Sequence, residues 1–148
     1  MKKFILLLII PFLSFGQVLT EKEAKSFFTE VANETASMCP MKLDKYTTIT
    51  SCLYIHKSRS ILYYGIMDVE LYLYEDSGLS RKEIEEFTIK EWQKMWLIEQ
   101  EKIQTNMFCS SPDMKIFRDN NIIVNYSYVN PSGLHIGTIQ LQNSKNCK

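Results

Sequence analysis

The longest alternating stretch of the sequence, residues 60–75, constrains the fold more than any other feature. Apolar and polar residues alternate here, with Met67, Val69, Leu71 and Leu73 on one side and Asp68, Glu70, Tyr72 and Tyr74 on the other. Because successive side chains of a β-strand point to opposite faces, this pattern predicts a strand with one buried side. We therefore predict a single strand over Ser60–Glu75 at the centre of an antiparallel sheet.

Two helices are predicted around this strand. The first begins at Glu21, because Thr20 and Glu23 have the spacing of a capping box, and it ends before Pro40. The second begins after a similar box formed by Ser80 and Glu83 and runs from Arg81 to about Met107. The apolar face of the first helix consists of Ala24, Phe27, Phe28, Val31 and Met38, and that of the second includes Trp92 and Trp96.

Three further strands complete the predicted sheet. A Thr-rich segment over residues 42–56 forms a hairpin with the central strand, and residues 122–129 and 134–142 form a second hairpin. Asn130–Gly133 is the turn between them, since Pro and Gly suit its central positions. The predicted fold class is α+β, with two helices on one face of a four-stranded antiparallel sheet in the order α-β-β-α-β-β. Residues 17–148 are expected to form a single domain.

The N-terminus has the features of a signal peptide over residues 1–16. Lys2 and Lys3 precede an apolar run from Phe4 to Leu13, and small residues at Ser14 and Gly16 suit cleavage before Gln17. The run is shorter than the roughly 20 residues that cross a bilayer. We expect an exported protein, periplasmic or extracellular, without a membrane span in its mature chain.

Four cysteines follow the signal peptide. An even number in an oxidising compartment favours two disulfides. Three pairings are possible, and we favour Cys39–Cys52 and Cys109–Cys147 because each would join elements that can be adjacent.

Charge and motif content argue against several classes of function. The formal net charge is zero, which disfavours nucleic-acid binding. The two histidines, His56 and His135, are not part of a zinc motif, and Cys52 and His56 would lie about 13 Å apart along a strand. We therefore predict no metal site and no cofactor.

A catalytic site would require either a cysteine nucleophile beside a histidine or a pair of carboxylates on one strand face. The residues concerned are Cys39, Cys52, His56, His135, Asp68 and Glu70. Structural disulfides and a solvated sheet face explain these residues better, so we predict no catalytic residue.

One group of residues favours binding instead. If the even-numbered face of the predicted central strand is not covered by helices, it presents tyrosines beside carboxylates, as protein and carbohydrate recognition surfaces often do. The candidate binding surface consists of Tyr64, Asp68, Glu70, Tyr72 and Tyr74.

Several short motifs resemble a loose class of small exported bacterial proteins of unassigned function. The motifs are Cys39-Pro40 after a helix, Asp44, Thr47-Thr48, Leu62-Tyr63-Tyr64, Cys109-Ser110-Ser111-Pro112, Tyr126-Ser127-Tyr128, Gly133 and Cys147. The resemblance implies a small exported domain and supports pairing Cys109 with Cys147. It implies no catalytic residue.

The leading hypothesis is an exported, non-enzymatic binding module whose partner is a protein or glycan of the cell envelope. One alternative is a small-ligand carrier with a pocket between helices and sheet, beneath Trp92 and Trp96. The other is an enzyme with a cysteine or carboxylate site of a kind not recognised here.

Overall fold

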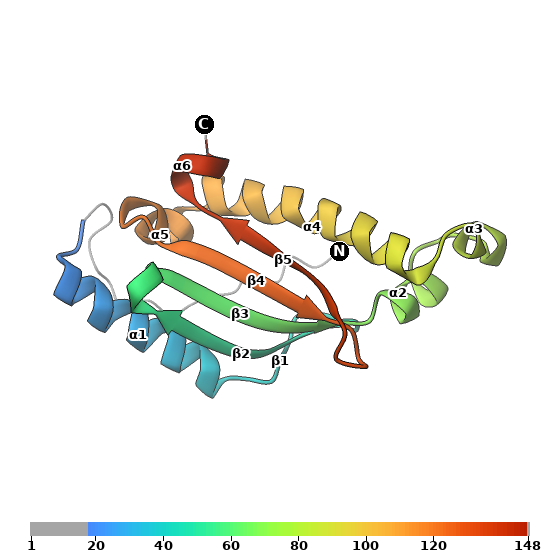
Figure 1. The fold of residues 1–148 in the computed structure, drawn as a ribbon, viewed down its shortest axis with the longest axis horizontal. Coiled ribbons are helices and arrows are strands. Elements are labelled where there is room, and N and C mark those ends of the chain that lie inside the picture. Colours follow the sequence, from blue (N-terminus) through green and yellow to red (C-terminus); the bar gives the residue numbers. More distant parts are fainter. Residues whose placement is uncertain (1–17, 148) are drawn as a thin grey trace.

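The computed structural model describes residues 18–147, which form an α+β fold built on one sheet (Figure 1). The sheet has five strands in the order β1-β2-β3-β4-β5, where β3 and β4 run parallel and the other neighbours are antiparallel. The strands are β1 Met41–Lys42, β2 Thr47–Ile55, β3 Ser60–Met67, β4 Ile123–Val129 and β5 His135–Leu141. The predicted α+β class is therefore confirmed, whereas the predicted four strands, all antiparallel, are wrong.

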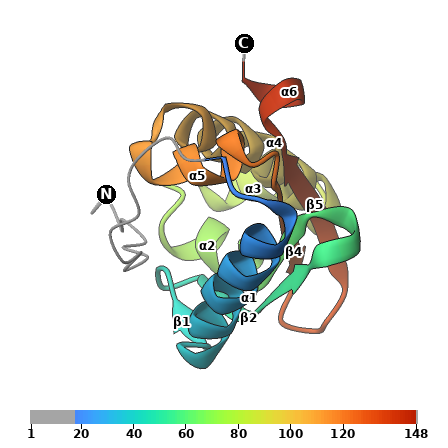
Figure 2. The same ribbon diagram turned by 90° about the vertical axis from the view of Figure 1, so that its left-hand side faces the viewer.

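The helices α1, α2, α4 and α5 lie on one side of the sheet, and the other side is left open (Figure 2). α1 packs on β2, and α4 packs on β5. The helices are α1 Glu21–Ser37, α2 Val69–Glu75, α3 Arg81–Glu85, α4 Ile89–Ser110, α5 Lys115–Asp119 and α6 Asn143–Asn146, with short 3-10 turns at His56–Ser58 and Pro112–Met114.

The parallel pair at the centre follows from the connection between its strands. The chain leaves β3 and passes through α2, α3, α4 and α5 before it enters β4. Such a helical crossover returns the chain to the starting end of the sheet, as a parallel pair requires. The turn Asn130–Gly133 joins β4 to β5 as predicted, with the Gly133 N–H donating to the Asn130 carbonyl at 2.8 Å.

The predicted strand over Ser60–Glu75 is only half correct. β3 ends at Met67, and the following residues form α2, where Asp68 is the N-cap and its side chain accepts a hydrogen bond from the Leu71 N–H at 3.0 Å. Val69 and Leu73 are four residues apart and both buried, so they belong to one helical face. The alternating pattern therefore also contained the spacing of a helix.

The second predicted helix is divided in two. α3 ends at Glu85, and α4 begins at Ile89 behind a separate capping box formed by Thr88 and Glu91. The predicted boxes at Thr20 with Glu23 and at Ser80 with Glu83 are both present. Each box satisfies backbone N–H groups that would otherwise lack a partner, which explains why the helices begin where they do.

The core lies between the helices and the inner face of the sheet. Three helices each contribute a fully buried aromatic side chain to the core: Phe28 of α1, Phe108 of α4 and Phe117 of α5. The strands contribute Ile61, Val124, Ile139 and Leu141, among others. α4 approaches β5 closely at Gly137, where an added Cβ would lie 2.2 Å from a methyl carbon of Leu97.

A disulfide between Cys109 and Cys147 joins the C-terminal end of α4 to the segment after β5, which confirms one predicted pairing. Cys39 and Cys52 are free thiols, so the second predicted disulfide is not formed in this structure. The predicted signal peptide over residues 1–16, and its cleavage before Gln17, lie outside the described residues. Within residues 18–147, no helix is both long and apolar enough to cross a membrane.

Candidate functional site

The structure divides the predicted binding surface into two places. Tyr64 is on β3 and points to the open side of the sheet, with 42% of its surface exposed. The other four residues lie in α2 or at its N-cap and not on the same strand face. They are Asp68, Glu70, Tyr72 and Tyr74. The five residues therefore do not form one continuous strand surface.

The residues around α2 have largely structural roles. The Asp68 carboxylate caps the helix, and the Tyr72 ring packs edge-on against Tyr46 with ring centroids 5.6 Å apart. The Tyr46 hydroxyl donates a hydrogen bond to Asp76, and partial burial together with this bond raises the pKa of Tyr46 to about 12. Tyr74 is 52% exposed and Glu70 is also exposed, so these two remain available to a partner.

The open side of the sheet is a broader surface than the one predicted. We call the outward side chains of β2–β5 the open face. Residues that are paired between adjacent strands form rows across this face. One row consists of Leu53, Leu62, Asn125 and Gln140, and another consists of Ser51, Tyr64, Ser127 and Thr138. The remaining members are Thr48, Ile55, Ile66, Ile123, Val129 and His135.

The open face contains no Lys, Arg, Asp or Glu. Its β2–β3 half is largely apolar, and Leu53 and Ile55 are 52% and 38% exposed. On the β4–β5 half, polar groups bond to one another: Gln140 donates to the Asn125 side-chain oxygen at 3.2 Å, and Thr138 to the Ser127 hydroxyl at 3.4 Å. A partner on this face would therefore displace few strongly hydrated groups.

The open face could have been recognised from the sequence. All the charged side chains of the chain lie outside β2–β5, since none of these four strands contains Lys, Arg, Asp or Glu. An ordinary solvated sheet face alternates apolar and polar residues, and charged residues are common on its wet side. The predicted central strand by itself does not reveal this face, because the neighbouring strands contribute much of it.

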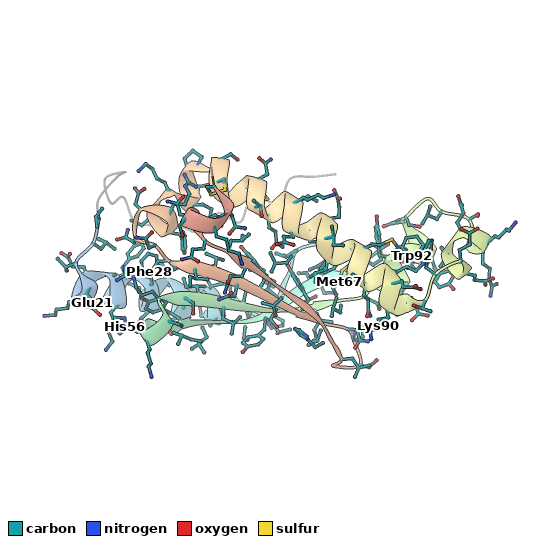
Figure 3. All side chains as sticks on the ribbon, turned by 45° about the horizontal axis from the view of Figure 1, so that its top comes forward. Glu21, Phe28, His56, Met67, Lys90 and Trp92 are labelled. Atoms are coloured by element: carbon teal, nitrogen blue, oxygen red, sulfur yellow. A yellow bond between two sulfur atoms is a disulfide. The ribbon has the colours of Figure 1, made fainter. Side chains whose placement is uncertain are left out.

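The groups considered for catalysis are dispersed. His56 lies beside Glu21 near the start of α1, with 3.7 Å between Nε2 and the carboxylate, whereas Met67, next to Asp68, lies at the far end of β3 (Figure 3). His135 is exposed, 3.2 Å from the Thr138 hydroxyl. Among residues 18–147, no three His, Cys, Asp or Glu side chains are grouped as a metal site would require.

Neither free thiol has the lowered pKa of an activated catalytic cysteine. Burial is the main cause that raises the pKa of Cys52 to about 12, and burial also raises the pKa of Cys39. A catalytic cysteine needs the opposite shift, because the thiolate is the nucleophile.

The two tryptophans are used in packing. The Trp92 indole donates to the Ile84 carbonyl at 2.9 Å and lies edge-on to Phe87, which joins α4 to α3. The Trp96 ring lies edge-on to Tyr128 of β4, with centroids 5.0 Å apart. Both indoles therefore take part in contacts within the protein.

Comparisons with known proteins identify the fold. No protein-family model matches the sequence, and no curated protein matches it. A candidate secreted protein of Pseudomonas aeruginosa is similar in structure, with a TM-score of 0.62 and 11% identity over 87% of this chain and 97% of that one.

Two similar structures are pilotins of the type II secretion system. EpsS of Vibrio vulnificus has a TM-score of 0.60 and 9% identity, covering 86% of this chain and 94% of its own. AspS of Vibrio cholerae has a TM-score of 0.53 and 8% identity, covering 84% and 93%. At these identities the similarity is one of fold: this chain has the α+β fold of a candidate secreted protein and of type II secretion pilotins.

Proposed function

We propose that the protein is an exported, non-enzymatic module that binds a protein of the cell envelope through the open face. The observation that carries this proposal is a sheet side that no helix of residues 18–147 covers and that has no charged side chain on its four long strands. The similarity in fold to two pilotins supports an envelope protein as the class of partner. Export, to the periplasm or out of the cell, is part of the same proposal.

The physical chemistry of the open face suits a protein partner. The cores of protein interfaces are depleted in charged residues and enriched in aromatic ones, because charges are costly to remove from water. Leu53 and Tyr64 provide exposed apolar area at the middle of β2 and β3, and Asn125 and Thr138 provide hydrogen-bonding groups beside it. The face therefore combines an apolar centre with a neutral polar margin.

Site-specific photocrosslinking in cells tests this proposal. A photoreactive residue in place of Tyr64 is expected to give a discrete adduct, whereas the same residue in place of Asn33, exposed on the outer side of α1, is expected to give none. A third position, Tyr74 of α2, tests whether the partner also reaches the second part of the predicted surface. Equal labelling at Tyr64 and Asn33 would contradict the proposal.

Treatment of the adduct with protease separates the two partner classes. Loss of the adduct identifies a protein, and a protease-resistant adduct would favour an envelope glycan instead. Leu53→Asp should abolish the Tyr64 adduct, because it places an unpaired charge at the centre of the contact. Asn33→Asp introduces the same carboxylate elsewhere and should leave the adduct unchanged.

A further inference from the structure

The two free cysteines lie in neighbouring segments near the C-terminal end of α1. Met41 of β1 is paired with Ile49 of β2, and the chain continues backwards from Met41 to Cys39 while β2 continues forwards to Cys52. Ile49 and Cys52 are both buried, on either side of the irregularity at Thr50. The antiparallel register therefore brings the segment that contains Cys39 alongside the part of β2 that contains Cys52, and both side chains pack in or against the core.

The surroundings of the two thiols distinguish them. Burial is the main cause that raises the pKa of Cys52, and a charge on Cys39 would raise it further. Cys39 is half-buried, and its thiol donates to the Thr35 carbonyl at 3.4 Å. Cys52 is only 7% exposed and lies opposite Tyr63 of β3 in the strand pairing. Cys39 is therefore the thiol that a reagent meets first.

We propose that Cys39 and Cys52 are a dithiol site that reacts with a low-molecular-weight disulfide and closes to a second intramolecular disulfide, which tethers the end of α1 to β2. The structure holds the reduced form of this site. The inference does not depend on the open face or its partner.

The reaction consists of two exchanges. Each proceeds through the small fraction of thiolate that the raised pKa values of Cys39 and Cys52 leave at neutral pH, so the reaction is slow there and faster in alkaline solution. The Cys39 thiolate attacks one sulfur of a disulfide such as oxidised glutathione, which forms a mixed disulfide and releases one glutathione thiolate. The Cys52 thiolate then attacks Cys39 Sγ, which forms the protein disulfide and releases the second glutathione. The two protein thiols lose two protons and two electrons, and oxidised glutathione gains them as two thiols.

Peptide mapping after incubation of the folded protein with oxidised glutathione tests the site. Trypsin should release the segments 26–42 and 46–57 as one disulfide-linked pair, and the two thiols should become resistant to alkylation in denaturant at the same rate. The existing Cys109–Cys147 disulfide should be recovered unchanged. A persistent glutathione adduct without the linked pair, or two thiols that stay free, would overturn the proposal.

Two variants test the order of the steps. Cys52→Ala should stop at a stable glutathione adduct on Cys39. Cys39→Ser should leave Cys52 unmodified in the folded protein and reactive only in denaturant, because Cys52 is buried. Circular dichroism of both variants checks that the fold is kept. Rapid modification of Cys52 in folded Cys39→Ser would show that Cys39 is not the entry point.

Discussion

The two faces of β3 have opposite environments although they alternate along one strand. Ile61, Tyr63 and Met67 point to the helices and are at most 3% exposed, whereas Tyr64 on the other face is 42% exposed. Both faces lack charged residues, so composition does not distinguish them. The difference shows that burial was decided by where α1 and α4 pack, because only the face that the helices cover is buried.

The largest expected effect separates the two faces directly. Phe28→Ala removes a fully buried ring that contacts Phe117 and Tyr54, and it should lower the free energy of unfolding by about 3–5 kcal/mol. Leu53→Ala on the open face should change it by about 0.5 kcal/mol or less. Urea unfolding followed by circular dichroism measures both. A similar loss in the two variants would mean that the open face is part of the core.

Removal of the disulfide should have the next largest effect. The double variant Cys109→Ser with Cys147→Ser should lose about 2–5 kcal/mol, because the unfolded chain gains conformational freedom. Thermal unfolding of this variant, compared with wild type under non-reducing conditions, gives the measurement. An unchanged midpoint would show that the bond contributes nothing to stability.

Gly137→Ala tests how closely α4 packs on the inner face. The added methyl group meets Leu97 and should cost about 1–3 kcal/mol, since a filled core accommodates extra volume poorly. Thr138→Ala, the next residue along β5, faces outward and is the matched control, with an expected change within about 0.5 kcal/mol. Equal effects in chemical denaturation would argue against tight packing of α4 on β5.

Among the changes on the covered side of the sheet, Tyr128→Phe should have the smallest effect near neutral pH. The variant leaves the Gln104 amide without its acceptor, which lies at 2.9 Å, and should lose about 1 kcal/mol. Burial raises the pKa of Tyr128 to about 12, so the folded state holds this proton more tightly than the unfolded state.

The sign of the pH dependence follows from that raised pKa. The contribution of the Tyr128 proton to stability is complete below the ordinary tyrosine pKa of about 10 and is lost as the pH rises from about 10 to about 12. Wild type should therefore lose more stability than Tyr128→Phe over this range, as urea unfolding at several alkaline pH values would show. A steeper loss in the variant would contradict the assignment.

Local signals in the sequence predicted the starts of helices and the tight turn well. The capping boxes at Thr20 and Ser80 each join hydrogen-bonding groups that are three residues apart, and the turn Asn130–Gly133 is closed by a hydrogen bond between its first and fourth residues. None of these features needs a contact with a distant part of the chain. The box at Thr88 was equally local and could have revealed the break between α3 and α4. The predicted binding surface does not form one strand face, because it combines Tyr64 of β3 with residues that belong to α2.

The caps, the turn and the uncharged strands depend on residues close together in the chain, so they can be predicted without knowledge of the fold. The helix over residues 69–75, the parallel pairing of β3 with β4 and the open sheet face depend on packing between distant segments. An alternating or uncharged segment can satisfy its backbone hydrogen bonds as strand or as helix, so its own residues do not choose between them. Burial of Val69 and Leu73 at the end of the sheet, and the packing of α1 and α4 on one side only, select between these states.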